Sequence, residues 1–231
     1  MISESGRYHL TYNGEIYNFK DFDPYAINDA RAYLNYIDKV GHETALQSAN
    51  GMYAYCLFDA VLKQIHLVVD RFGQKPLYYC HSLQSYWLLG APMGEETLFK
   101  WIKKLTGSHH LIYDIQKNEV KIERYWTPQY QEDTSGIEDL ILDAINKVKV
   151  ADVPVYVFLS GGIDSTLVAS QCTGMNAVHL NSPEYHYASR AAERFGMKLI
   201  QVNPVEFDVE KCLQDYAFQV GQPSMASLIP Y

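Results

Sequence analysis

The sequence predicts two consecutive domains, an α+β domain with antiparallel sheets followed by an α/β domain with a parallel sheet. In the first half, short runs of aromatic and β-branched residues alternate with turn residues at the spacing of an antiparallel sheet. After Gly136, strand-like and helix-like segments alternate, which indicates parallel strands joined by crossover helices. The clearest junction is the apolar run 155–159, which stops at Ser160-Gly161-Gly162 and is followed at once by a helical pattern.

The first expected strand covers residues 8–12 and leads into Asn13-Gly14, which is a turn signal. Asn28 has the chemistry of a helix N-cap, so a helix is expected over residues 29–40. It ends at a glycine, the residue that most often follows a helix. The other expected elements of this half are strands at 52–58, 64–69, 77–80 and 86–89, a helix at 97–105, and a hairpin of 110–115 with 120–126.

Residues 127–136 are polar and aperiodic, which predicts a linker between the domains. The expected domain bounds are therefore 1–127 and 136–231. A helical period begins at Ile137, and too few strands follow to complete a typical sheet, so the second domain is expected to lack its C-terminal part. The expected elements after the glycine loop are a helix ending near Cys172, strands at 177–180 and 198–202, and helices at 183–195 and 208–220.

Composition narrows the class of protein. The chain has 231 residues, 48% hydrophobic and 20% charged, with a formal net charge of −8, which argues against a nucleic-acid surface. No apolar stretch approaches the ~20 residues of a membrane span. The four cysteines are scattered and show no metal-ligand spacing, so they are expected to be buried thiols in a reducing, cytoplasmic compartment.

The segment Ser-Gly-Gly-x-Asp-Ser, residues 160–165, carries the strongest functional signal. Glycines let the backbone approach a phosphate, and a helix N-terminus favours an anion through its free N–H groups and dipole. Asp164 adds a carboxylate for a metal and Ser165 a hydroxyl for a phosphate oxygen. The alternative is a plain glycine turn, but the strand-loop-helix context is what a phosphate loop requires.

Three further segments combine with this loop. They are Tyr12-Asn13-Gly14-Glu15-Ile16-Tyr17-Asn18, then Asn50-Gly51-Met52 leading to Asp70-Arg71-Phe72-Gly73-Gln74-Lys75-Pro76, and finally Val153-Pro154. In this order the chain resembles the glutamine-dependent asparagine synthetases, from about Arg7 to the last residue. The resemblance implies a class II glutamine amidotransferase domain with an Ntn-hydrolase-like fold. It also implies an ATP-pyrophosphatase domain with an adenine nucleotide alpha hydrolase-like fold.

The resemblance also implies roles for residues in the first domain. Asn13 and Gly14 match the pair that forms the oxyanion hole during attack on the glutamine amide, a type of contact that usually contributes much to catalysis. Glu15 and Asp29 match the acids that bind the α-amino group of glutamine. The segment from Asp70 to Tyr79 is interpreted as structural.

In the second domain the resemblance implies ATP and pyrophosphate binding at the glycine loop, with Mg²⁺ near Asp164. Leu159 and Val178 match positions that contact adenine, and Val178 reaches the loop only if the two strands are neighbours. The substrates implied are glutamine, aspartate and ATP, and a homodimer is compatible with the family. The residues implied for ATP and pyrophosphate are Leu159, Ser160, Gly161, Gly162, Asp164, Ser165 and Val178.

The chain departs from the family at its first residues. The family's nucleophile is a cysteine at the mature N-terminus, whereas this chain begins Met1-Ile2-Ser3, so the chain as written is expected not to hydrolyse glutamine. Its first cysteine, Cys56, lies in a strand pattern and is expected in the core. Two other functions stay open on the sequence: ATP-dependent ring closure of the β-lactam-synthetase type, and non-catalytic nucleotide binding.

Overall fold

The structure, a computed structural model, describes residues 1–80, 95, 97, 101–130, 135–151, 153–203, 210 and 211. The chain divides into two compact units, and the division between them falls after Gln131. Each unit is described by itself. Among the residues described, no helix has the length and apolar character needed to cross a membrane.

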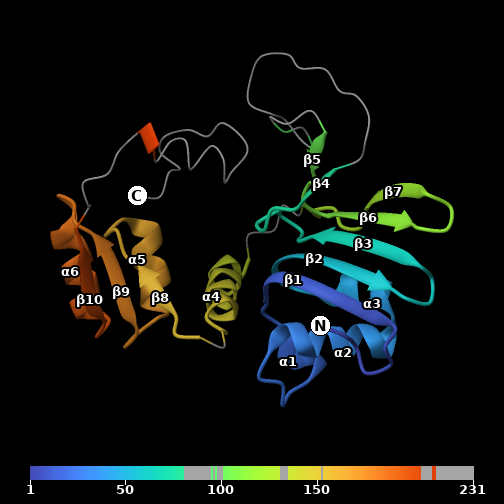
Figure 1. Ribbon diagram of the computed structural model, residues 1–231. Coiled ribbons are helices and arrows are strands. Elements are labelled where there is room, and N and C mark those ends of the chain that lie inside the picture. The colour runs from blue at the N-terminus through green and yellow to red at the C-terminus, as the bar shows by residue number, and fades with distance from the viewer. Residues whose placement is uncertain are drawn as a thin grey trace. The chain divides into compact units, whose positions relative to one another are not determined.

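The first unit is built on a five-stranded antiparallel sheet (Figure 1). Its elements are β1 (Tyr8–Ile16), α1 (Phe19–Phe22), α2 (Asp29–Val40), α3 (His42–Ser48), β2 (Gly51–Asp59), β3 (Gln64–Val69), β4 (Tyr78–Cys80), β5 (Ile102–Lys104), β6 (His109–Asp114) and β7 (Glu119–Arg124). The large sheet has the order β1-β2-β3-β6-β7, and β4 pairs with β5 in a separate ribbon. The predicted strands at 52–58, 64–69 and 77–80 and the predicted hairpin are confirmed, whereas the predicted strand at 86–89 lies outside the described residues.

Local signals determine the helix α2. The Asn28 side chain accepts a hydrogen bond from the Arg31 N–H at 2.9 Å and so caps the N-terminus. Gly41 ends the helix with a φ of 85° and donates its N–H to the Ile37 carbonyl. The predicted helix over residues 29–40 is therefore confirmed at both ends.

Two local predictions were wrong. Asn13-Gly14 is not a turn, because β1 runs through it and pairs Asn13 with Ala54 and Gly14 with Tyr53. The chain reverses instead through α1, α2 and α3, which lie between β1 and β2 in the sequence. Residues 102–104 are not helical, because they form the strand β5 against β4; ladder pairing here overrides a helix-like apolar pattern.

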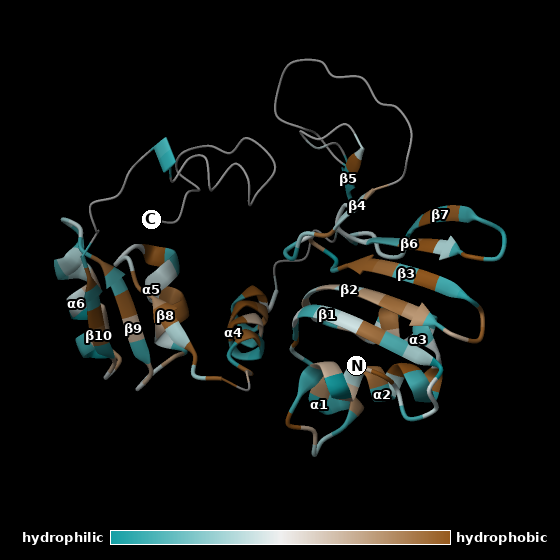
Figure 2. Ribbon diagram, viewed as in Figure 1, coloured by the Kyte–Doolittle hydropathy of each residue, from teal (hydrophilic) through white to brown (hydrophobic). Residues whose placement is uncertain are grey.

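The core of the first unit lies between the large sheet and its helices. Tyr33, Leu34 and Ile37 of α2 are fully buried, and Tyr55 and Leu57 of β2 are buried against the same cluster. Figure 2 shows hydrophobic stretches, coloured brown, along the strands of this sheet. A core with several tyrosines needs partners for their hydroxyl groups, and one pair is Tyr33 with Tyr55 at 3.2 Å.

A fully buried carboxylate organises the turn after β3. Asp70 accepts four backbone N–H groups, from Tyr53 at 3.2 Å, Phe72 at 3.0 Å, Gln74 at 3.1 Å and Lys75 at 3.0 Å. Its side chain thereby accepts hydrogen bonds from backbone N–H groups of both β2 and the turn. These N–H groups have no partner among the described strands of the sheet. The interpretation of this segment as structural agrees with these contacts.

The second unit holds a three-stranded parallel sheet and three helices. Its elements are α4 (Ile137–Val148), β8 (Tyr156–Phe158), α5 (Ile163–Ser170), β9 (Asn176–Leu180), α6 (Tyr185–Arg194) and β10 (Lys198–Val202). The order is β10-β9-β8, and both strand pairs are parallel, as predicted. The predicted helix at 208–220 lies almost wholly outside the described residues.

Small side chains form much of the core of this second unit. Ala169 of α5, Ala177 of β9 and Ala188 of α6 are each fully buried. Alanine lets helices approach a sheet closely, so α5 and α6 pack against it with little space between them. Leu159 at the end of β8 is buried in the same cluster.

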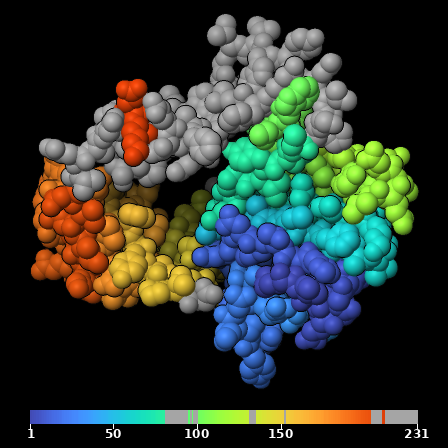
Figure 3. Space-filling view, in the orientation of Figure 1, coloured from blue at the N-terminus to red at the C-terminus, as the bar shows by residue number. Residues whose placement is uncertain are grey.

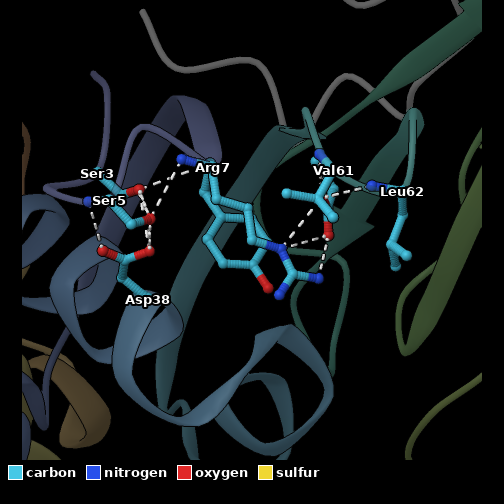
Figure 4. Close-up of polar contacts among 8 residues, drawn as sticks. Ser3, Ser5, Arg7, Asp38, Val61 and Leu62 are labelled. Carbon is cyan, nitrogen blue, oxygen red and sulfur yellow. Dashed lines mark hydrogen bonds and ion pairs between the residues drawn. The ribbon is translucent and has the colours of Figure 1, made fainter.

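The first residues of the chain lie on the surface of the antiparallel unit and are tied to it by polar contacts (Figures 3 and 4). The Asp38 carboxylate accepts the Ser5 N–H at 3.0 Å and the Ser3 hydroxyl at 3.1 Å. Arg7 binds Asp59 through two nitrogens, Nε at 3.1 Å and Nη2 at 2.7 Å. Paired donors of this kind fix the orientation of both side chains.

These contacts predict an acid-sensitive N-terminal segment. Burial would raise the pKa of Asp59, but hydrogen bonds from Arg7 and from the Leu62 and Val61 N–H groups outweigh it, so the pKa is lowered. A carboxyl whose folded pKa is depressed stabilises the protein above its unfolded pKa of about 3.9, and this contribution is lost as the pH falls through the folded pKa.

The Arg7→Gln variant is expected to lose about 1–2 kcal/mol of unfolding free energy at neutral pH. Much less should be lost at a pH below the depressed folded pKa of Asp59, where the parent also loses the ion pair. Urea denaturation followed by circular dichroism at both pH values measures this difference. An equal loss at both pH values would contradict the assignment to Asp59.

Candidate functional site

The glycine loop joins the carboxyl end of β8 to the start of α5. Gly162 is the N-cap position of α5, and the Thr166 N–H donates to the Gly162 carbonyl at 3.0 Å to begin the helix. The Ser160 hydroxyl lies 3.0 Å from the Ser165 hydroxyl and accepts the Gly162 N–H at 3.3 Å. The two serines thus hold the loop in a tight turn with both hydroxyl groups at its surface.

The start of α5 has the properties of an anion site. No described side chain caps Gly162, so the first-turn N–H groups of residues 163–165 are available to an incoming acceptor. Ser160, Gly162 and Asp164 are exposed. The helix dipole adds a partial positive charge at the same end, which favours a phosphate.

The two glycines of the loop have different structural roles. Gly161 has a φ of +92°, and a Cβ there would lie 2.7 Å from Tyr187 Cβ and 2.8 Å from the Ala188 nitrogen of α6. It is therefore required for packing against the helix. Gly162 would place a Cβ only near Ser160 Oγ, at 3.5 Å, so the space above it is open. Of the two glycines, Gly162 is thus the one that leaves room for a ligand.

The strand pairing brings Val178 to the loop as predicted. Phe158 pairs with Val178 across β8 and β9, and the Leu159 N–H donates to the Val178 carbonyl at 2.9 Å. Val178 is half-buried, whereas the Leu159 side chain is only 1% exposed and faces the core. The predicted contacts of both residues with adenine stay predictions.

His179, which the sequence analysis did not single out, holds the ends of the two strands together. It is buried, and its Nδ1 lies 2.7 Å from the Leu159 carbonyl oxygen. Its Nε2 lies 3.3 Å from the Ser182 hydroxyl, which also accepts the Glu184 N–H. In the sequence, this role is indicated only by the presence of a histidine inside an apolar strand pattern. Through it, the Ser182-Pro183-Glu184 segment supports the backbone just before the glycine loop.

The residues implied for glutamine binding lie along β1 and at the start of α2. Asp29 Oδ2 accepts the Tyr12 hydroxyl at 2.8 Å and the Ile16 N–H at 2.9 Å, so Asp29 lies at the end of β1 that carries Glu15. Burial and the nearby Asp29 and Glu15 carboxylates raise the pKa of Tyr12 strongly. Glu15 is half-buried and Asn13 is exposed.

Gly14 allows β1 and β2 to approach closely beside this cluster. Its φ is +143°, and a Cβ there would lie 2.1 Å from the Met52 carbonyl oxygen. Gly51 on the facing strand has the same constraint, since its Cβ would lie 2.1 Å from the Glu15 carbonyl oxygen. The two glycines therefore set the position of the backbone that carries Asn13 and Glu15.

The cysteines differ in exposure. Cys172 is buried and Cys56 is half-buried, and burial raises the pKa of both thiols, which makes them weak nucleophiles. Cys80 is exposed at the end of β4, so the prediction that all four cysteines are buried was wrong. A three-residue strand with one exposed face leaves Cys80 outside the core. Cys212 lies outside the described residues.

The two units match two protein families in the expected order. Residues 1–91 match the glutamine amidotransferase domain family, and residues 136–230 match the asparagine synthase family. The two matches define a class of protein in which a glutamine amidotransferase domain precedes an asparagine synthase domain. The chain belongs to the glutamine-dependent asparagine synthetase family.

Curated relatives agree with this assignment. The chain is 28% identical to a protein assigned as glutamine-hydrolyzing asparagine synthetase 2 of Methanocaldococcus jannaschii, over 93% of this chain and 52% of the relative. It is 28% identical to asparagine synthetase 2 of Bacillus subtilis, over 73% of this chain and 30% of the relative. The chain therefore spans about half or less of the length of these relatives.

Solved structures also align with the chain. Among them, the glutamine phosphoribosylpyrophosphate amidotransferase of B. subtilis, complexed with ADP and GMP, aligns over 93% of this chain and 52% of its own. The identity is 13% and the TM-score is 0.38.

Proposed function

We propose that this chain forms part of a glutamine-dependent asparagine synthetase. In this reaction ATP activates the side-chain carboxylate of aspartate as an acyl adenylate and pyrophosphate leaves. Ammonia, released when glutamine is hydrolysed to glutamate, then attacks the acyl carbon. AMP leaves with its electron pair, and asparagine forms after loss of a proton. Adenylation is needed because an unactivated carboxylate has no good leaving group.

The loop of residues 160–165 is the observation that carries this proposal. We assign the first-turn N–H groups of α5 and the Ser165 hydroxyl to the β- and γ-phosphate oxygens of ATP. These donors are fixed before the ligand arrives, so they stabilise the charge that develops on the departing pyrophosphate without reorganising. Leu159 directly follows β8 and Val178 lies beside it on β9. Val178 and the Leu159 backbone are proposed to border the adenine.

The residues present fit a role for Mg²⁺. Asp164 is an exposed carboxylate in the first turn of α5, directly beside the proposed phosphate position. Magnesium in nucleotide sites usually takes one or two protein carboxylates, phosphate oxygens and water, so Asp164 would be its protein ligand. When bound, the ion would neutralise the charge of the phosphates.

In the first unit we propose the glutamine site along β1. Asn13 and the Gly14 N–H would form the oxyanion hole, and Glu15 and Asp29 would bind the α-amino group of glutamine. Asp29 already accepts hydrogen bonds from Tyr12 and Ile16, which would hold its carboxylate in a fixed position for an ammonium group.

Several finer assignments belong to the same proposal. The first unit would have the Ntn-hydrolase architecture over residues 1–127, and the second the adenine nucleotide alpha hydrolase architecture over residues 136–231. The partners would be small molecules, the protein would act in the cytoplasm, and a homodimer would be the assembly. The relatives favour asparagine synthesis over β-lactam ring closure or non-catalytic nucleotide binding.

The decisive prediction concerns Gly162. Its φ of −71° suits any residue and the space above it is open, so Gly162→Val should fold normally. A branched side chain there would block the approach of a phosphate and should weaken binding of Mg-ATP and pyrophosphate by about 10-fold or more. Isothermal titration calorimetry of the purified chain measures this directly.

Matched variants make the test specific. Lys117→Ala, at an exposed position of the first unit, should bind as the parent does. Asp164→Asn should weaken binding mainly when Mg²⁺ is present, because an isolated carboxylate repels phosphate. Gly161→Val should also weaken binding, but it collides with α6 and so tests packing as well. Unchanged affinity in Gly162→Val would refute the phosphate-loop assignment.

A further inference from the structure

Three histidines from three separate elements meet inside the first unit. His66 lies on β3, His110 on β6, and His42 is the first residue of α3. In the sheet register His66 pairs with Ile112 and His110 pairs with Val68, so both histidines point to the same face of the sheet. His42 reaches this face from the helix side, and all three rings are at least 94% buried.

The three rings are close enough to share one ion. One ring nitrogen from each residue can be chosen so that the three nitrogens lie within 4.8 Å of one another. His66 Nδ1 is 2.9 Å from His110 Nε2, and the ring centroid of His42 lies 4.6 Å from that of His66 and 5.0 Å from that of His110. The three histidines are far apart in the sequence, and their spacing there does not indicate a metal site.

Two of the three outward nitrogens lie near the kinds of groups that support metal-bound histidines. His42 Nε2 lies 2.9 Å from the Tyr55 hydroxyl, and His110 Nδ1 lies 3.8 Å from the Glu43 carboxylate. A ligating histidine typically directs its second nitrogen to a carboxylate or another polar group, which fixes the ring. His42 Nδ1, on the inner side, is buried and has no hydrogen-bond partner among the described residues.

We propose that His42 Nδ1, His66 Nδ1 and His110 Nε2 bind a zinc ion. Three imidazoles suit zinc rather than magnesium or calcium, which prefer oxygen ligands. In tetrahedral zinc sites the ligand nitrogens lie about 3.3 Å apart, given Zn–N distances of about 2.0–2.1 Å. The His66–His110 separation would therefore widen slightly on binding.

The fourth position would be open to solvent. A cleft of about 270 Å³ borders His42 and His66 and also touches Glu43, so an ion can enter from this side. All three rings are buried, which favours the neutral imidazole over the charged form. Neutral imidazole is the form that binds a metal.

A bound zinc ion would link α3 to the sheet. The ion would join the first residue of α3 to two neighbouring strands, and it would supply a partner for the unsatisfied His42 Nδ1. This role is separate from the proposed glutamine and ATP sites. A metal-free alternative exists, in which the histidines form a neutral hydrogen-bonded cluster; it leaves His42 Nδ1 unpaired.

The test uses the full chain, stripped with a chelator and titrated with ZnCl₂ against a chromophoric competitor. We expect one zinc ion per chain and a rise in melting temperature on addition of zinc. His42→Gln, His66→Gln and His110→Gln should each weaken zinc binding by about 100-fold or more, since even a supporting residue contributes 10–100-fold. Cobalt(II) should give the visible spectrum of a tetrahedral site.

Two further variants keep the test decisive. His186→Gln, at an exposed histidine of the second unit, should bind zinc like the parent. Tyr55→Phe keeps the core volume and removes only the hydroxyl that lies next to His42 and Tyr33, so it should weaken binding by about 10-fold without unfolding the protein. The proposal is wrong if the parent takes up no stoichiometric zinc, if its melting temperature does not rise, or if Tyr55→Phe and folded histidine variants bind zinc unchanged.

Discussion

Replacing Asp70 with alanine is expected to lower the free energy of unfolding of the antiparallel unit by about 3–5 kcal/mol. The carboxylate is fully buried and accepts four backbone N–H groups from Tyr53, Phe72, Gln74 and Lys75. Alanine would leave these donors without an acceptor, and each buried unsatisfied group costs about 1–3 kcal/mol when water cannot reach it. The turn can open partly to water, so the total loss in unfolding free energy is smaller than the sum of the costs of the four N–H groups.

Two further substitutions serve as comparisons for Asp70→Ala. Asp70→Asn retains one oxygen acceptor but directs an amide group at two of the donors, so its loss should be smaller than that of alanine. Asp21→Ala, at an exposed position on α1, should change stability by less than about 0.5 kcal/mol. Urea unfolding monitored by circular dichroism gives all three values. An Asp70→Ala loss no larger than that of Asp21→Ala would mean that the turn is not held by this carboxylate.

Gly14→Ala is the second substitution with a large expected effect, a loss of about 3–5 kcal/mol in unfolding free energy. The added Cβ would lie 2.1 Å from the Met52 carbonyl oxygen and 2.6 Å from the Tyr53 Cα. Both are backbone atoms of β2, so no side chain can move aside, and the two strands must separate. The φ of +143° adds a conformational cost that alanine cannot avoid.

Gly6→Ala separates the two costs. Gly6 has a φ of +74°, but a Cβ there would contact nothing within 4 Å, so only the backbone conformation is penalised. Its expected loss is about 1–2 kcal/mol, and the excess in Gly14→Ala measures the collision with β2. Thermal unfolding of both variants makes the comparison. Equal losses of unfolding free energy would show that β1 and β2 can move apart around residue 14 at little cost.

The sequence by itself determined the elements whose signals are local. The cap at Asn28 and the terminating Gly41 determine α2, and the alternation after Gly136 predicts the parallel sheet, because caps and periodicity act over a few residues. The glycine loop was recognised for the same reason. A strand end, a turn and a helix start follow one another directly, so their geometry is fixed by adjacent residues.

Only the tertiary structure decided the features that depend on a distant backbone. Asn13-Gly14 has the local signature of a turn, yet β2 pairs with it and makes it a strand, and residues 102–104 become a strand by pairing with β4. The roles of Gly161 and Gly162 differ only because α6 packs against one of them. His42, His66 and His110 are far apart in the sequence and meet because sheet register and helix packing, which no local pattern encodes, place them on one face.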